Sequence, residues 1–202
     1  MLIQDIFTQR FARIKNINVD HDKVLSDLKK ADFKVVNNSH ETKVRITKDI
    51  KLLKHMKTGK LLEKEINKHL KKVIKEGFGF DVKHEIVNSW GTLAKPGVDT
   101  KFHYHKNFWL SACYYPHGSP EDKYKIIFQD MRYNHWEIDV VEYNNFNAPY
   151  WSVFVERGDL IIFPAHLSHA IGTNNTDTDR YSIAVNILPK GRIGHNDGEL
   201  IL

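Results

Sequence analysis

The texture of the sequence changes near Lys83, and this change limits the possible folds more than any other feature. From there onward, short runs rich in Ile, Val, Tyr, Phe and Trp are separated by Gly, Pro, Asn and Asp at turn-like spacing. Such runs predict β-strands joined by turns. The candidate strands are HEIVNSWGTLA, KFHYH, WLSACYYP, YKIIFQD, HWEIDVV, YWSVFV, GDLIIFP and RYSIAVNIL. About eight antiparallel strands of this length predict a sandwich or a jelly roll.

The first part of the chain has a helical pattern instead. Between Lys60 and Glu76, apolar residues recur at three- and four-residue intervals, and Gly77 is placed to end the helix. A shorter helix is predicted over residues 22–30, and KDIKLLKHM predicts another. We therefore expect a helical N-terminal region, residues 1–80, that packs on the core without forming an independent domain. Residues 81–202 would form the β domain.

The single cysteine, Cys113, excludes an internal disulfide and a metal site made of thiolates. One cysteine in a chain of this length is typical of a reducing compartment. The N-terminal stretch MLIQDIFTQRF places Asp5 and Arg10 among its apolar residues, so it lacks the unbroken hydrophobic region of a signal peptide. No later run approaches the ~20 apolar residues that cross a bilayer. We expect a soluble, cytoplasmic protein without a membrane partner.

Positive charge is concentrated in the first part of the chain. Residues 1–80 hold 19 of the 30 Lys and Arg residues but only 10 of the 25 Asp and Glu residues. Many of these lysines belong to a predicted helix whose other face is apolar, which favours a solvated helix face over a nucleic-acid surface. No Arg-rich segment with interleaved aromatic residues occurs, so nucleic-acid binding is not indicated.

A pair of histidines and three downstream residues form the chemical signal. His103 and His105 are two apart on a predicted strand, so both side chains can point to one face and chelate a metal. Because the chain contains 12 histidines, the pair alone could equally be a surface or packed pair. His169 follows the buried run GDLIIFP, and Arg180 and Ser182 share one face of the last strand. A guanidinium and a nearby hydroxyl together suit a carboxylate, and so a dicarboxylate ligand.

The order HxH, S-x-x-Y-Y, G-D-L-x-x-F-P, H and R-x-S resembles the Fe(II)- and 2-oxoglutarate-dependent oxygenases. Within this superfamily, the sequence is most similar to the prolyl-hydroxylase-like branch, and in that branch to a group of oxygenases with an HxH motif. The resemblance is strong over residues 88–194 and loose over the helical part. It implies a mainly β protein with N-terminal helices (α+β), built on a double-stranded β-helix of the jelly-roll or cupin-like kind. The matching residues are Trp90, His103, His105, Leu110, Ser111, Tyr114, Tyr115, Gly158, Asp159, Leu160, Phe163, Pro164, Leu167, His169, Asn174, Arg180, Ser182 and Asn186.

The resemblance implies that Fe(II) is bound by His103 and His169, with a third ligand from the second HxH position. Most members of the superfamily place a carboxylate there, to make the 2-His-1-carboxylate arrangement, whereas this chain has His105. Either three imidazoles bind the iron, or a carboxylate comes from elsewhere. Asp130 and Asp99 are the candidates, and Asp130 is favoured because it ends a predicted strand.

For the cosubstrate, the resemblance implies that Arg180 binds the distal carboxylate of 2-oxoglutarate, assisted by Ser182 and Tyr115, with Ser111 on the same side. The implied reaction converts 2-oxoglutarate into succinate and carbon dioxide and hydroxylates a substrate, with ascorbate as reductant. That substrate, a small molecule or a protein residue, is not identified by the sequence, and neither is the oligomeric state. The candidate residues at the substrate entrance are Asn88, Trp90 and Arg132.

Two other functions fit part of the pattern. A cupin-type metalloprotein would explain GVDTKFHYH, but cupins commonly add a glutamate shortly after this pair, and none occurs between Lys106 and Pro120. Arg180 and Ser182 would also have no role in a cupin. A non-catalytic binding module on a β-sandwich would show neither iron dependence nor succinate formation.

Overall fold

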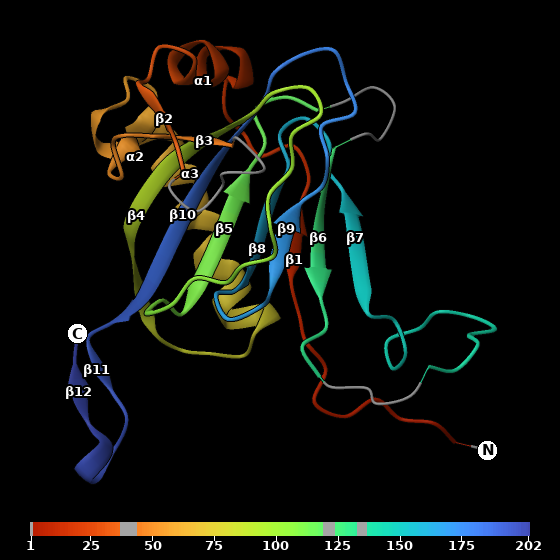
Figure 1. Ribbon diagram of the computed structural model, residues 1–202. Coiled ribbons are helices and arrows are strands. Elements are labelled where there is room, and N and C mark those ends of the chain that lie inside the picture. Colours follow the sequence, from red (N-terminus) through yellow and green to blue (C-terminus); the bar gives the residue numbers. More distant parts are fainter. Residues whose placement is uncertain (1, 37–43, 119–123, 133–136) are drawn as a thin grey trace.

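The structure, a computed structural model, describes residues 2–36, 44–118, 124–132 and 137–202. Two antiparallel β-sheets face each other, and helices cover the outer surface of the larger sheet (Figure 1). The larger sheet has seven strands in the order β1-β8-β5-β10-β4-β3-β2, and the smaller has three in the order β7-β6-β9. Among the described residues, no helix combines the length and apolar character needed to cross a membrane.

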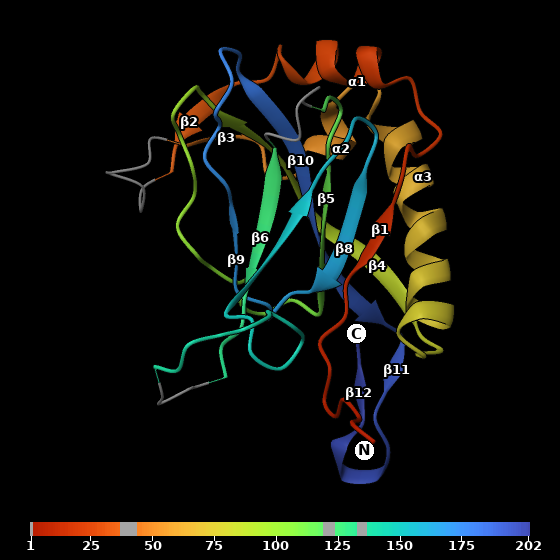
Figure 2. The ribbon, with the colours of Figure 1, turned by 90° about the vertical axis from the view of Figure 1, so that its right-hand side faces the viewer.

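The strands divide between the two sheets and a terminal hairpin. The larger sheet contains β1 (Ala12–Ile14), β2 (Phe33–Val35), β3 (Arg45–Thr47), β4 (Lys83–Ala94), β5 (Leu110–Tyr114), β8 (Leu160–Pro164) and β10 (Arg180–Lys190). The smaller sheet contains β6 (Lys125–Gln129), β7 (Tyr150–Phe154) and β9 (His169–Ile171). A hairpin of β11 (Arg192–Ile193) and β12 (Leu200–Ile201), with the 3-10 turn η2 (Asn196–Gly198) between them, projects from the body (Figure 2).

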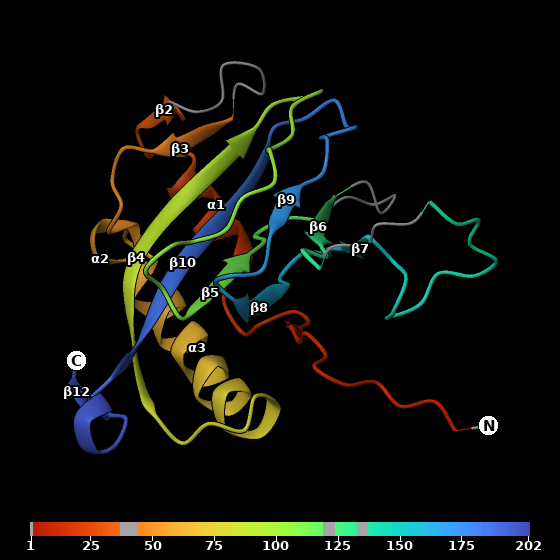
Figure 3. The same ribbon diagram turned by 60° about the horizontal axis from the view of Figure 1, so that its bottom comes forward.

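The helices are α1 (His21–Leu28), α2 (Leu52–His55) and α3 (Gly59–Lys72), and α3 continues into a π-helical turn, η1 (Val73–Gly77). At the start of α1, the Asp20 carboxylate accepts a hydrogen bond from the Lys23 N–H at 3.0 Å, which caps the helix. In α3, Leu62, Ile66 and Leu70 are fully buried at four-residue spacing. This buried face lies against the larger sheet (Figure 3), as the apolar periodicity predicted.

Two apolar cores result from this layering. One lies between the helices and the outer face of the larger sheet, where Leu62 and Ile66 share a cluster with Ile183 and Val185. The other lies between the two sheets and includes Ile126 from β6. Full burial of one such side chain contributes about 1.5–3 kcal/mol. Because both faces of the larger sheet are covered, β8 is apolar on both sides instead of alternating.

The inner face of the larger sheet is where the chemistry-bearing side chains gather. On β10 the residues pair with β5 on one side and β4 on the other, so that Ala184 lies between Cys113 and Trp90. One row further along, Ser182 lies opposite Thr92. Arg180, Ser182, Ala184 and Asn186 therefore share one face of β10, as the sequence predicted, and that face looks toward the smaller sheet.

Two predicted strands are absent. KFHYH makes only an isolated bridge between His103 and His169, because a single residue pair meets the smaller sheet. In HWEIDVV, the described residues 137–141 are exposed and form no strand, since no neighbouring strand pairs with them. Its first two residues lie outside the described part of the chain.

Besides the two strands of the terminal hairpin, four short strands in the sheets were not predicted. Three of them, β1, β2 and β3, come from residues 1–80, so this region supplies strands to the larger sheet as well as helices. The fourth, β9, belongs to the smaller sheet. Each has three residues, which is too short for a local alternation to show. The domain boundary near residue 80 stays a prediction.

Candidate metal and cosubstrate site

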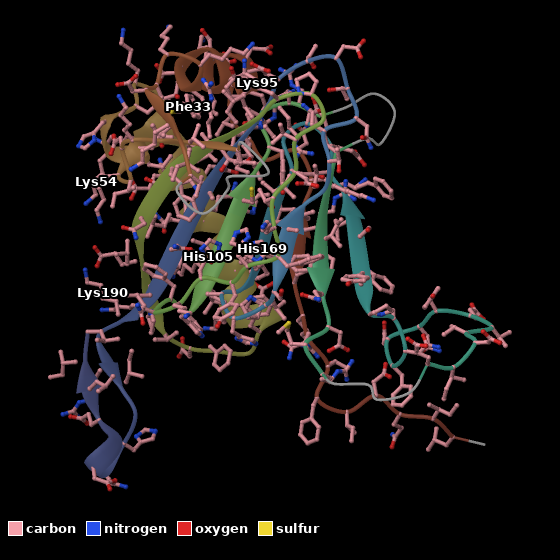
Figure 4. The ribbon with its side chains drawn as sticks, viewed as in Figure 1. Phe33, Lys54, Lys95, His105, His169 and Lys190 are labelled. Atoms are coloured by element: carbon pink, nitrogen blue, oxygen red, sulfur yellow. The ribbon has the colours of Figure 1, made fainter. Side chains whose placement is uncertain are left out.

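Three histidines from two segments converge between the sheets. The backbones of His103 and His169 exchange two hydrogen bonds, of 3.0 and 2.9 Å, and the His105 N–H donates to the Ala165 carbonyl at 2.9 Å. One nitrogen from each of the three imidazoles lies within 4.8 Å of the others. Figure 4 shows His105 and His169 close together between β5 and β9. The three nitrogens can therefore bind one metal ion.

The hydrogen bonds of two of these rings fix their tautomers. Nδ1 of His103 lies 2.8 Å from the Lys101 carbonyl, and Nδ1 of His169 lies 2.8 Å from the Leu167 carbonyl. A carbonyl oxygen only accepts, so each Nδ1 carries a proton, and in the neutral ring Nε2 has the lone pair that binds a metal. Nε2 of His105 lies 3.3 Å from Nε2 of His169, so these atoms point to one place.

The environment keeps the inner two imidazoles neutral. Burial, reinforced by the neighbouring His103, lowers the pKa of His105 to about 4 and that of His169 to about 3. Neutral imidazole is the form that binds a metal. His169 is buried, His105 is half-buried and His103 is exposed, so His103 lies at the mouth of the site.

Aromatic rings hold the imidazoles in place. The ring of Phe163 lies 4.7 Å from that of His169, edge to face, and the ring of Trp90 lies 5.5 Å from that of His105. The ring of Phe128 lies 6.4 Å from that of His169 and packs against Phe163. Packed apolar neighbours of this kind restrict the rotamers of the ligands, which preorganises a metal site.

The candidate carboxylates lie elsewhere. Asp130 forms an ion pair with Arg132, whose Nε lies 2.8 and 3.0 Å from the two carboxylate oxygens. These hydrogen bonds lower the pKa of Asp130. Asp99 accepts a hydrogen bond from the Thr173 hydroxyl at 3.4 Å. Within the described part of the chain, neither carboxylate joins the group of three histidines.

At the opposite end of the inner face, the side chain of Arg180 is buried. Only 3% of its surface is exposed, and neither Nη atom has a partner in the part of the chain that the structure describes. The hydroxyl of Tyr115 is also buried and has no hydrogen-bond partner among the described residues. Tyr115 lies close enough to Arg180 to raise the pKa of the guanidinium, against the effect of burial. The ring of Tyr124 lies 5.3 Å from the guanidinium carbon. A buried, unpaired cation is costly, so this end of the site fits an anionic ligand.

Electrostatics agree with that interpretation. Burial lowers the pKa of Arg180 and raises that of Tyr115 well above its usual value. Both shifts arise mainly because burial removes charge from water, and no described group pairs with the Nη atoms of Arg180 or with the Tyr115 hydroxyl. A carboxylate would supply that partner, since it accepts hydrogen bonds from a guanidinium and from a phenol at the same time.

A cavity of about 340 Å³ extends from the three histidines to Tyr115. Its wall includes the three histidines and Ser111, Tyr115 and Trp90. Arg180 and Ser182 do not line it directly. They lie further along the inner face of β10 than Ala184, which lines the cavity, and Arg180 is near Tyr115, which lines it too. The Ser111 hydroxyl donates to the Asn186 side chain at 2.8 Å, which places Ser111 nearer to the histidines than to Arg180.

Of the three candidate substrate residues, only Trp90 lines the cavity. Asn88 lies on β4 opposite Asn186, and Arg132 is exposed and paired with Asp130. The structure also adds wall residues that the sequence did not indicate, namely Val36, Val44 and Ile46 around β2 and β3. Apolar residues in three-residue strands look like any other surface hairpin in the sequence.

Comparisons with known proteins agree with this geometry. A family model described as "Putative 2OG-Fe(II) oxygenase" matches residues 88–186, which contain the three histidines, Tyr115 and Arg180. None of the curated proteins matches the chain in sequence.

Several solved structures share the fold at low sequence identity. The α-ketoglutarate-dependent epimerase SnoN from nogalamycin biosynthesis has a TM-score of 0.69 and 13% identity, over 90% of this chain and 77% of its own. A prolyl hydroxylase from Trichoplax adhaerens, in complex with a hypoxia inducible factor peptide fragment, has a TM-score of 0.63 and 11% identity. This match covers 88% of this chain and 83% of the hydroxylase. HygX from Streptomyces hygroscopicus, with nickel and 2-oxoglutarate bound, has a TM-score of 0.61 and 15% identity. This match covers 90% of this chain and 84% of HygX.

The fold is therefore the double-stranded β-helix that these oxygenases share, which confirms the predicted fold class. The family match, together with the shared fold, supports the superfamily of Fe(II)- and 2-oxoglutarate-dependent oxygenases, which includes prolyl-hydroxylase-like members. Its cofactors are Fe(II) and 2-oxoglutarate, and the histidine group and the unpaired Arg180 fit both.

Proposed function

We propose that His103, His105 and His169 together hold the Fe(II) ion of this oxygenase, without a carboxylate ligand. Support comes from the convergence of the three imidazoles, from the tautomers of His103 and His169, and from the lowered pKa values of His105 and His169. Asp130, the alternative ligand, is neutralised by Arg132 instead.

The same proposal assigns the distal carboxylate of 2-oxoglutarate to Arg180 and Tyr115, with Ser182 beside them. Ser111 would contact the cosubstrate nearer to the metal. Binding would satisfy three of the four buried side-chain polar atoms that have no partner among the described residues, namely both Nη atoms of Arg180 and the Tyr115 hydroxyl. This pairing would stabilise the complex, because hydrogen bonds between charged groups are stronger than neutral ones.

The reaction proposed is hydroxylation of a C–H bond in a small molecule or a protein residue. Fe(II) with 2-oxoglutarate and dioxygen supplies the oxidising chemistry, in which 2-oxoglutarate becomes succinate and carbon dioxide. The protein orients the cosubstrate through Arg180, keeps water out with the apolar walls, and places the substrate beside Trp90. Of the other entrance candidates, Asn88 could contribute from the neighbouring row, whereas Arg132 is tied to Asp130.

The observation that carries the proposal is the pairing of two complementary ends in one cavity. Three imidazoles converge at one end, and the buried guanidinium of Arg180, whose Nη atoms have no partner among the described residues, lies near Tyr115 at the other. A cupin-type metal site or a non-catalytic module would explain the first end but not the second. We also place the protein in the cytoplasm, since its single cysteine suits a reducing compartment.

The test is oxygen-dependent succinate formation. Protein purified without oxygen would be mixed with Fe(II), 2-oxoglutarate and ascorbate, and succinate would be measured before and after oxygen is admitted. Slow turnover is expected even without the natural substrate, and Arg180→Met should abolish it while Arg192→Met, an exposed arginine, should not. If the wild-type protein binds neither iron nor 2-oxoglutarate, the proposal is wrong.

A further inference from the structure

The cavity extends beyond the space between the histidines and Arg180. The cosubstrate residues lie on β5 and β10, whereas a second compartment lies toward β4 and β3. The strand pairing defines it, because Ser182 is opposite Thr92 and Thr92 is opposite Ile46. We call the space bounded by Trp90, Ile46, Val44 and Val36 the lateral compartment.

The described residues that line the lateral compartment are mostly apolar. Trp90 forms one side, beside His105, and the three aliphatic residues from the ends of β2 and β3 form the other. Ile171 continues the apolar wall from β9. The compartment therefore lies next to the proposed metal, at the place where a substrate C–H bond has to be.

Few hydrogen-bonding groups face this space. Among the described lining residues it offers the hydroxyls of Thr92 and Thr100, and the Thr100 hydroxyl already accepts the Ile171 N–H at 2.7 Å. Lys101 is exposed and lies toward the mouth, where its carbonyl holds His103. A sugar or a nucleobase placed here would bury several polar groups without partners, at a cost of about 1–3 kcal/mol for each.

The size of the cavity sets a second limit. A volume of about 340 Å³ lies near the lower end of the range for ligand pockets, roughly 300–1,000 Å³, and 2-oxoglutarate must share it. Only a limb of a large substrate, or a small molecule, can enter the remainder.

We infer that the substrate places an uncharged hydrocarbon group, a branched aliphatic chain or a single aromatic ring, between Trp90 and Ile46. This inference rests on the proposed function, because it takes the histidines as the metal end of the cavity. The group belongs either to a free small molecule or to an apolar protein side chain, and both present the same chemistry to the compartment.

The experiment uses the full chain with Mn(II) in place of Fe(II) and with 2-oxoglutarate bound. Mn(II) speeds the relaxation of nearby protons, so NMR reports which probes come close to the metal without any turnover. Toluene tests a free hydrocarbon, and N-acetyl-leucinamide tests a side chain on a peptide unit. Glucose and uridine are the polar comparison.

Ile46→Asp places a carboxylate in the lateral compartment, and Ile46→Leu keeps it apolar. Val35→Asp is the matched control. It makes the same kind of change on the same hairpin, but Val35 pairs with Arg45, faces the other way and is 47% exposed. Relaxation of the 2-oxoglutarate protons in every variant checks that the metal end is intact.

In the wild-type protein, at least one apolar probe should relax about tenfold more strongly than glucose or uridine, since burial of one or two methylene groups is worth about that factor. The effect should vanish in Ile46→Asp and persist in Ile46→Leu and Val35→Asp. Relaxation of toluene alone points to a small-molecule substrate, and of N-acetyl-leucinamide alone to a protein side chain.

Equal relaxation of the polar probes, or an unchanged effect in Ile46→Asp, overturns the inference. It also fails if 2-oxoglutarate relaxes near Mn(II) but no apolar probe does, and the proposed function then stands. If Mn(II) does not relax 2-oxoglutarate at all, the proposed function fails and the inference fails with it.

Discussion

At the scale of single residues, the site is defined by groups whose environments are unfavourable without a ligand. Arg180 is charged, buried and unpaired among the described residues, and the imidazoles of His105 and His169 are kept neutral by burial. The types and spacing of these residues could be predicted from the sequence. The lack of other partners for these groups could not be predicted, because it depends on which side chains the fold keeps away from the site. Asp130, for example, pairs with Arg132 and does not join the histidines.

Arg180→Met should separate binding from stability. It should weaken 2-oxoglutarate binding by about 2–5 kcal/mol, or about 30- to 4,000-fold, because the buried carboxylate would lose its charged partner. Without cosubstrate, the variant should be as stable as the wild type or about 1–4 kcal/mol more stable, since an unpaired buried cation is removed. Calorimetric titration and urea unfolding measure the two effects, with Arg192→Met as the control. Unchanged 2-oxoglutarate affinity would contradict the assignment.

At the scale of elements, the long segments were predictable and the short ones were not. The periodicity of α3 and the alternation of β10 are local patterns that extend over 14 and 11 residues. In contrast, β9 and β1 to β3 have three residues each, and long-range pairing alone makes them strands. KFHYH shows the converse. Its alternation is typical of a strand, but only one of its residues, His103, pairs with another segment, so no strand forms.

The packing of α3 against the larger sheet should account for a large part of the stability. Leu70 is fully buried at this contact, and Leu70→Ala should lower the free energy of unfolding by about 2–5 kcal/mol. Its neighbour Lys71 is exposed, so Lys71→Ala should change that free energy by less than about 0.5 kcal/mol. Urea denaturation measures both values. Similar effects of the two substitutions would mean that the helix does not pack as described.

At the scale of the whole molecule, two sheets and one helical layer place the metal end and the cosubstrate end of the cavity on a rigid frame. The larger sheet carries Arg180, and the smaller sheet carries His169. Burial in this frame also makes stability depend on pH. His117 shows this outside the site, where its Nε2 accepts the Tyr181 N–H at 2.9 Å and burial lowers its pKa to about 4.

The stability of the protein should therefore fall as the pH drops from about 6.5 toward 4. In this range the unfolded chain binds a proton at His117, whose ordinary pKa is about 6.5, while the folded protein does not. The contribution is fully present above pH 6.5 and is lost at up to about 1.4 kcal/mol per pH unit for this one proton. His117→Gln keeps an acceptor but cannot be protonated, so its unfolding free energy should decline less steeply. Parallel curves for the two proteins would exclude this role for His117.

The central claim is that three imidazoles hold the iron with no carboxylate. It is tested most directly by anaerobic titration of Fe(II) into the wild-type protein, His105→Ala and Asp130→Ala. We predict that His105→Ala loses tight iron binding and that Asp130→Ala retains it, because Asp130 is committed to Arg132. Retention of iron by His105→Ala together with its loss from Asp130→Ala would contradict the account.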